Sequence, residues 1–133
     1  MKTLVLAAGL MALALPAAAG DAAKGETAFK QCKSCHAITK PDGTDVVKGG
    51  KTGPNLWGIV GRTAGTEAGF KYGESLVAAG AAGLVWDEAT LATWVADPGA
   101  FLAGKVGDGA KSKMTFKLKA GGEDVAAYLE TMK

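Results

Sequence analysis

Both cysteines and the only histidine of the 133-residue chain lie in the segment CKSCH, residues 32–36. Four kinds of site use such residues. A disulfide across this spacing closes a very short loop and restricts the unfolded chain little. A thioredoxin-like redox pair belongs to a βαβ context, and no alternation of strand and helix patterns surrounds the motif. Structural zinc takes four cysteine or histidine ligands, whereas this chain offers only Cys32, Cys35 and His36.

The fourth interpretation is covalent haem attachment, for which C-x-x-C-H is the sequence signature. The two thiols add to the vinyl groups of the haem, and the adjacent histidine reaches the iron from one face. One helical turn can present all three groups to a single porphyrin. The motif therefore favours a haem protein with Cys32 and Cys35 as attachment sites and His36 as an iron ligand.

The second axial ligand is expected to be a methionine, because the chain contains no second histidine. Met1 and Met11 fall in a segment that export should remove, and Met132 falls on what reads as a packed helix face. Met114 lies in the polar stretch KSKMTFK, which has no helical periodicity. A thioether is a common haem ligand, so Met114 is the candidate. The alternative is an exposed loop methionine with no role.

Residues 1–19 have the layout of a cleaved secretory signal peptide. Lys2 precedes an apolar run over residues 4–15, and Pro16 precedes three alanines. The alternative is a membrane anchor, but this run is shorter than the roughly 20 residues that span a bilayer. Cleavage before Gly20 leaves one domain, residues 20–133, with 14 Lys and Arg against 13 Asp and Glu. This balance argues against a nucleic-acid binder, and export implies an oxidising compartment.

The chain reads as mostly helical, with long glycine-rich loops and neither repeats nor a strand hairpin. A first helix opens at Asp21, and Gly25 within it suggests close approach by another backbone. A short helix is expected over residues 74–79, ended by Gly80. Asp87 caps a further helix that Pro98 stops, and a short turn follows over residues 99–102. The last helix starts near residue 122, and its apolar stripe is Val125, Tyr128, Leu129 and Met132.

In this order along the chain, several segments resemble those of class I c-type cytochromes, and most of all those of bacterial cytochrome c2, which is related to mitochondrial cytochrome c. The segments are GDAAKGETAFKQCKSCH, KTGPNLWGIVGR, GFKYGESL, VWDEATLATWVADP, KMTF and GGEDVAAYLETMK. The resemblance implies an all-α cytochrome c fold. In this fold the N- and C-terminal helices pack together, while short helices and loops wrap around one covalent haem c.

The resemblance also implies roles for individual residues. The Pro54 carbonyl accepts a hydrogen bond from the His36 ring, as such partners do for metal ligands. Three residues that would satisfy the buried haem propionates are Arg62, Tyr72 and Trp86. Phe116 lies next to the haem edge, and Gly25 and Phe29 form the contact between the first and last helices. Many relatives have tyrosine where this chain has Trp94, whose single N–H changes the hydrogen bonding around Met114; the alternative is a simple core residue.

These features predict a monomeric, soluble one-electron carrier of the periplasm, which is not an enzyme. The resemblance implies a membrane-bound cytochrome bc complex as donor, and a photosynthetic reaction centre or cytochrome oxidase as acceptor. Formal charge is +3 over residues 24–51, +4 over residues 105–119 and −3 between them. A lysine ring around the haem edge would steer docking to acidic partners; the alternative is ordinary solvated lysines.

Three other functions compete with the carrier. A haem enzyme, such as a peroxidase or a small-molecule reductase, needs an open iron and usually a distal acid–base group. A gas-binding protein needs a labile sixth ligand. An exported protein without haem would hold one disulfide.

The resemblance also implies a change of iron ligand at high pH, where Lys111 or Lys113 can displace Met114 from ferric iron.

Overall fold

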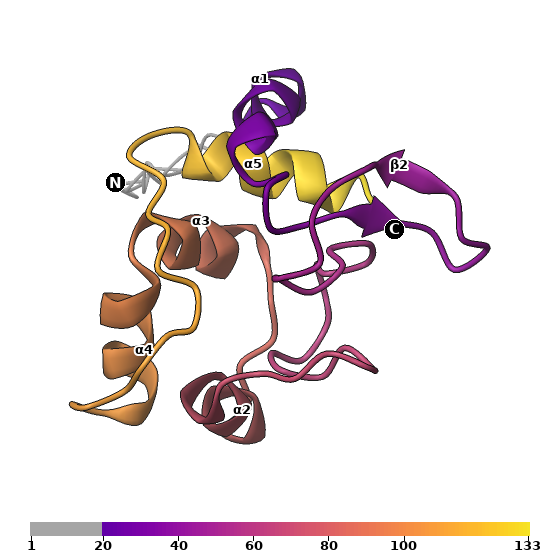
Figure 1. Cartoon of the computed structure of the whole chain (residues 1–133). Coiled ribbons are helices and arrows are strands. Elements are labelled where there is room, and N and C mark those ends of the chain that lie inside the picture. Colours follow the sequence, from indigo (N-terminus) through magenta and orange to yellow (C-terminus); the bar gives the residue numbers. More distant parts are fainter. Residues whose placement is uncertain (1–19) are drawn as a thin grey trace, which may run out of the picture.

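The computed structural model describes residues 20–133 and contains five α-helices with little strand (Figure 1). The expected signal peptide, including Met1 and Met11, lies outside the described residues. The elements are α1 (Ala22–Ala28), the 3-10 turn η1 (Phe29–Gln31), β1 (Ile38–Thr39), β2 (Asp45–Val47), α2 (Glu74–Ala81), α3 (Glu88–Ala96), α4 (Pro98–Val106) and α5 (Gly122–Glu130). None of the helices in this part of the chain is long and apolar enough to cross a membrane.

The first and last helices cross each other, and α3 packs against α5 (Figure 1). The Asp21 carboxylate caps α1 by accepting the N–H groups of Ala23 and Lys24, at 2.9 and 3.1 Å. Gly25 lies at the crossing, where a Cβ would stand 1.9 Å from the carbonyl oxygen of Asp124. One turn later, the ring of Phe29 packs against Tyr128 with centroids 5.6 Å apart. The expected close approach at Gly25 is therefore confirmed.

A chain reversal at Asp97 and Pro98 separates α3 from α4. The Asp87 side chain caps α3 in a reciprocal box with Thr90. Asp97 then accepts the N–H of Ala100 and starts α4, with Pro98 in its first turn. The sequence prediction of only a short turn over residues 99–102 was wrong, since α4 extends to Val106.

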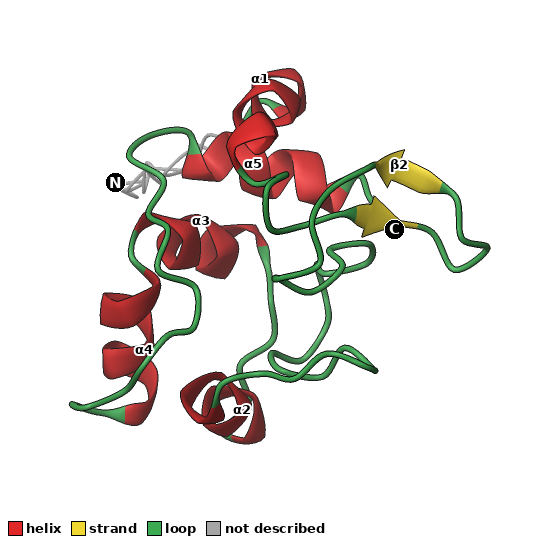
Figure 2. Ribbon diagram, viewed as in Figure 1, coloured by secondary structure: helices red, strands yellow, loops and turns green. Residues whose placement is uncertain are grey.

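Two further expectations were wrong. Gly80 does not end α2, which continues to Ala81; a Cβ at Gly80 would lie 2.0 Å from the Ala64 carbonyl oxygen, so this glycine serves close packing. A small antiparallel hairpin also exists, in which Ile38 pairs with Val47 (Figure 2). Its strands have only two and three residues, which is too short for an alternating pattern to be visible.

Loops make up the middle of the molecule, and the helices surround them on several sides (Figure 2). Among residues 20–133, eighteen buried hydrophobic side chains form the core, including Phe29, Trp86, Trp94, Leu102 and Leu129. Met132 lies just beyond the end of α5 and is half-buried against this core, so it extends the predicted stripe without belonging to the helix.

Candidate cofactor site

A cavity of about 390 Å³ lies among the long loops, and all nine residues predicted to attach, ligate or contact the haem line it. They are Cys32, Cys35, His36, Pro54, Arg62, Tyr72, Trp86, Met114 and Phe116. These residues come from segments separated by up to 84 positions in the sequence, so the fold is what brings them together. The volume falls in the range of small-molecule and cofactor sites.

The end of α1 and the turn after it position the attachment motif. Cys32 donates its N–H to the carbonyl of Phe29 at 2.8 Å, and His36 donates to the carbonyl of Cys32 at 2.9 Å. One turn of chain therefore carries both sulfur atoms and the imidazole. No disulfide joins the two cysteines; Cys32 is half-buried and Cys35 is exposed. Burial, reinforced by the neighbouring Cys35, raises the pKa of Cys32 to about 11.

The His36 ring is fixed by the loop that faces it. Its Nδ1 lies 2.8 Å from the carbonyl oxygen of Pro54. Because a carbonyl can only accept, Nδ1 carries the proton and leaves Nε2 free as a metal ligand. Burial lowers the pKa of His36, and the hydrogen bond to Pro54 offsets part of this lowering. The resulting neutral imidazole is the form that binds iron.

Glycines let this loop lie directly against the motif. A Cβ on Gly53 would stand 2.4 Å from Cε1 of the His36 ring, and a Cβ on Gly49 would stand 1.9 Å from the His36 carbonyl oxygen. Two hydrogen bonds join the segments: Gly53 donates to Cys35 at 2.7 Å, and Gly50 donates to Lys33 at 2.8 Å. No side chain larger than hydrogen fits at these positions, so the imidazole has little freedom to turn.

An apolar wall closes another part of the cavity. Trp94 packs edge-on against Trp86 at 5.4 Å and against Phe101 at 5.8 Å between ring centroids. Trp94 is both a core residue, as the alternative interpretation held, and a cavity-lining residue. Met114 is half-buried at the cavity, and Phe116 is 40% exposed at its rim.

Polar side chains gather around Arg62, which lines the cavity. One guanidinium nitrogen, Nη2, donates to the carbonyl of Trp57. The other, Nη1, lies 2.7 Å from the Glu67 carboxylate but is buried without a well-aligned hydrogen bond. The Tyr72 hydroxyl accepts the N–H of Glu67 at 3.2 Å, and burial raises its pKa. Glu67 was missed by the sequence analysis, because no motif marks it.

These features fit a haem c. The cavity has apolar walls, two thiols and a neutral imidazole on one turn, and a thioether from a distant loop. The Arg62 guanidinium and the O–H of Tyr72 are donors suited to carboxylates, which haem carries as propionates. Within residues 20–133, no cluster of three or more His, Cys, Asp or Glu side chains could hold a bare metal ion. The zinc interpretation therefore has no ligand set.

The chain resembles known cytochromes over nearly its whole length. Cytochrome c2 of Rhodobacter capsulatus is 60% identical over 135 residues, which cover 99% of this chain and 98% of the relative. Cytochrome c-551 of Roseobacter denitrificans is 53% identical over 98% of this chain and 95% of its own length. No protein-family model matches.

Solved structures agree. Cytochrome c2 of Rhodobacter capsulatus has a TM-score of 0.83 at 62% identity, over 84% of this chain and 97% of that one. Ferric cytochrome c-550 of Paracoccus versutus has a TM-score of 0.83 at 52% identity, over 85% and 98%. The chain therefore belongs to the class I c-type cytochromes. It is an electron carrier with one covalent haem c, and the predicted all-α cytochrome c fold is confirmed.

Proposed function

We propose that this protein is a soluble periplasmic one-electron carrier whose haem iron is bound by His36 and Met114 from opposite faces. The observation that carries the proposal is the fixed, neutral His36, which shares one cavity with Met114. Haem c, when bound, supplies an iron that alternates between the ferric and ferrous states. With His36 and Met114 both bound to the iron, substrates and gases would have no access to it, so the protein would act as a carrier and not as an enzyme.

The chain's residues prepare the site for both oxidation states. Pro54 and Gly53 hold the imidazole in one orientation, so that the ligand need not move when the charge of the iron changes. The neutral, soft sulfur of Met114 favours the ferrous form and raises the reduction potential. Arg62, Tyr72 and Trp86 surround the propionate end, where a buried carboxylate needs donors. Phe116, partly exposed at the rim, lies beside the haem edge.

Export of the protein begins with residues 1–19 as a signal peptide cleaved before Gly20, which leaves the cytochrome domain, residues 20–133. The packing of Gly20 supports this boundary. A Cβ there would lie 2.0 Å from the carbonyl oxygen of Glu123, and the next N–H, of Asp21, donates to the Asp124 carboxylate at 2.7 Å. The folded domain therefore includes the chain from residue 20 onward.

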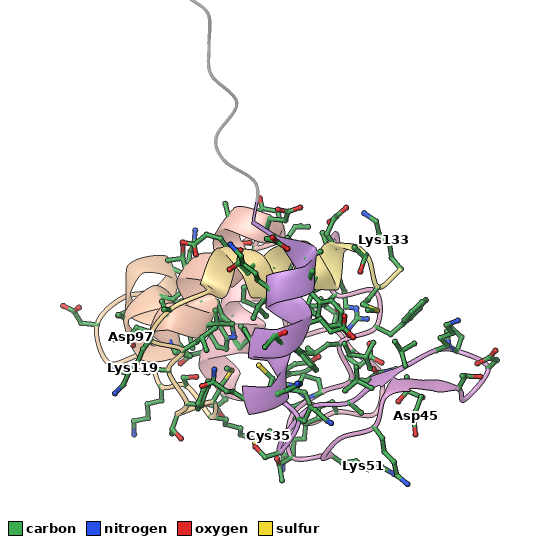
Figure 3. The ribbon with its side chains drawn as sticks, turned by 90° about the horizontal axis from the view of Figure 1, so that it is seen from above. Cys35, Asp45, Lys51, Asp97, Lys119 and Lys133 are labelled. Atoms are coloured by element: carbon green, nitrogen blue, oxygen red, sulfur yellow. The ribbon has the colours of Figure 1, made fainter. Side chains whose placement is uncertain are left out.

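Transient docking through lysines brings the carrier to its partners, for which we propose a cytochrome bc complex, and a photosynthetic reaction centre or cytochrome oxidase. Lys111 and Lys113 line the cavity. Figure 3 shows Lys51 and Lys119 on either side of Cys35, while Lys133 lies at the opposite edge. Asp45 and Asp97 lie near these two lysines in the same view, so the support for docking is the net positive charge of residues 24–51 and 105–119, which suits acidic partner surfaces. Association rates that do not fall with ionic strength would contradict this docking.

The decisive test is the visible spectrum of the reduced, haem-loaded protein with and without carbon monoxide. A low-spin spectrum that the gas leaves unchanged supports closure of the iron by His36 and Met114. Met114→Ala provides the control, because it should bind the gas readily. A wild-type spectrum that shifts with carbon monoxide would favour a gas-binding protein or an enzyme instead.

A further inference from the structure

The segment that carries Met114 has few attachments to the rest of the molecule. Residues 107–118 contain neither helix nor strand. Towards its ends, Gly107 caps α4, the Lys117 ammonium donates to the Asp97 carboxylate at 2.9 Å, and Leu118 donates its N–H to the carbonyl of Val95 at 2.8 Å. Between residues 111 and 116, both hydrogen bonds that leave the segment, as far as the described residues show, end in residues 71–75. Besides the contacts at its ends and the packing of Met114 against the core, the loop is therefore held by that short stretch.

The first of these two attachments is made by Ser75, in the first turn of α2. Its hydroxyl oxygen accepts the backbone N–H of Lys111 at 2.9 Å, across 36 positions of sequence. The start of α2 does not use this hydroxyl as a cap, since its N-cap residue is Gly73. The Ser75 hydroxyl therefore makes a contact that the capping of its own helix does not require.

The second attachment lies beside it and is made by Lys113. The Lys113 ammonium donates to the carbonyl of Lys71 at 3.2 Å. Its aliphatic stem lies across Gly73, where a Cβ would stand 3.2 Å from the Lys113 Cγ. Within the segment, the Ser112 hydroxyl donates to the Met114 carbonyl at 2.8 Å. Hydrogen bonds of Lys111, Ser112 and Lys113 therefore restrain the chain from residue 111 up to Met114.

We propose that Ser75 is a positioning residue for Met114: by holding the Lys111 backbone against α2, it keeps the thioether directed at the iron. This inference rests on the proposed ligation by Met114. A sulfur–iron bond competes with release of the loop, and each attachment lowers the freedom that release would regain. Without the Ser75 hydroxyl, a larger fraction of the ferric protein has Met114 dissociated.

The test is imidazole binding to the ferric, haem-loaded protein, because imidazole occupies the position that Met114 vacates. Its apparent affinity scales with the fraction of molecules in the open state. Ser75→Ala should raise that affinity about five-fold, the factor that one ordinary hydrogen bond represents. It should also weaken the sulfur-to-iron charge-transfer band. Global stability should change little, because alanine is a good helix former.

Thr27→Ala is the matched control. Thr27 is an exposed helical residue whose hydroxyl bonds only to the Ala23 carbonyl of its own helix, at 3.5 Å. The imidazole affinity of the Thr27→Ala variant should equal that of the wild type. If the wild type shows the charge-transfer band and Ser75→Ala binds imidazole no better, the positioning role of Ser75 is overturned, whereas the proposed ligation by Met114 is not affected. If the wild type lacks the band, ligation by Met114 fails, and this inference fails with it.

Discussion

The crossing of α1 and α5 leaves no room for a side chain at Gly25, so Gly25→Ala should destabilise the protein. The new Cβ would lie 1.9 Å from the Asp124 carbonyl oxygen and 2.8 Å from the Cβ of Tyr128. Ordinary contacts between such atoms are about 3.5 Å. The helices must therefore separate by roughly 1.5 Å, which loosens the nearby contact of Phe29 with Tyr128.

Two opposing terms set the size of the effect. Overpacking costs about 3 kcal/mol at a rigid site, because a helix carbonyl cannot turn aside as a flexible side chain could. Alanine in place of glycine returns about 1 kcal/mol of helix propensity. The expected net loss is about 2 kcal/mol of the free energy of unfolding.

Gly104 provides a matched control, because it is an exposed glycine within α4 and a Cβ there would meet no atom within 4 Å. Gly104→Ala should gain about 0.5–1 kcal/mol. Guanidinium unfolding of the haem-loaded variants, followed by circular dichroism, measures both changes if the slopes agree. Equal stability of the two variants would refute the steric argument at the crossing.

Three further outcomes are expected. Gly53→Ala places a Cβ 2.4 Å from the His36 ring and should increase the high-spin fraction in the visible spectrum; an unchanged spectrum would contradict the clamp. Glu67→Gln removes a negative charge 2.7 Å from Arg62 and should raise the reduction potential in a spectroelectrochemical titration; a fall would refute this. Hydrogen bonding to the Ala100 N–H in the first turn of α4, together with the ion pair to Lys117, holds the pKa of Asp97 below its ordinary value of 3.8. The ionised Asp97 therefore stabilises the fold above pH 3.8, and this stabilisation is lost as the pH falls through the lower pKa of the folded state. Asp97→Asn should therefore flatten the acid limb of a pH–stability curve, and an unchanged limb would exclude this source.

Patterns that are local in the sequence predicted local structure well. Asp87 caps α3 as expected, and its box with Thr90 lies within four residues. The stripe of α5 also predicted the burial of Val125, Tyr128 and Leu129, since helical spacing decides which residues share a side. Ala126 and Ala127, which the stripe did not include, are buried too. The attachment motif is local too, because one turn holds Cys32, Cys35 and His36.

Features that depend on a distant partner escaped prediction. Gly80 looked like a helix end, but its role is set by the Ala64 carbonyl, sixteen positions away. The pairing of Glu67 with Arg62 has no sequence signature, because a charge five positions away in a loop can point anywhere. The family resemblance is what indicated Pro54, and the structure places its carbonyl on the imidazole. The ligand role of Met114 remains a prediction.

The sides of the cavity that carry His36 and Met114 are built differently, and this difference bears on the proposed function. The imidazole is held by Pro54 and by glycine backbones that tolerate no displacement. Met114 packs against the core from a loop whose outward hydrogen bonds over residues 111–116, among the described residues, end in the stretch 71–75, and Lys117 adds an ion pair to Asp97. Opening of the iron should therefore begin on the methionine side, because fewer contacts have to break there. The attachment motif makes the chain a haem protein. If Met114 is the second ligand as proposed, the attachments of its loop decide whether the iron stays closed as in a carrier or becomes available to ligands.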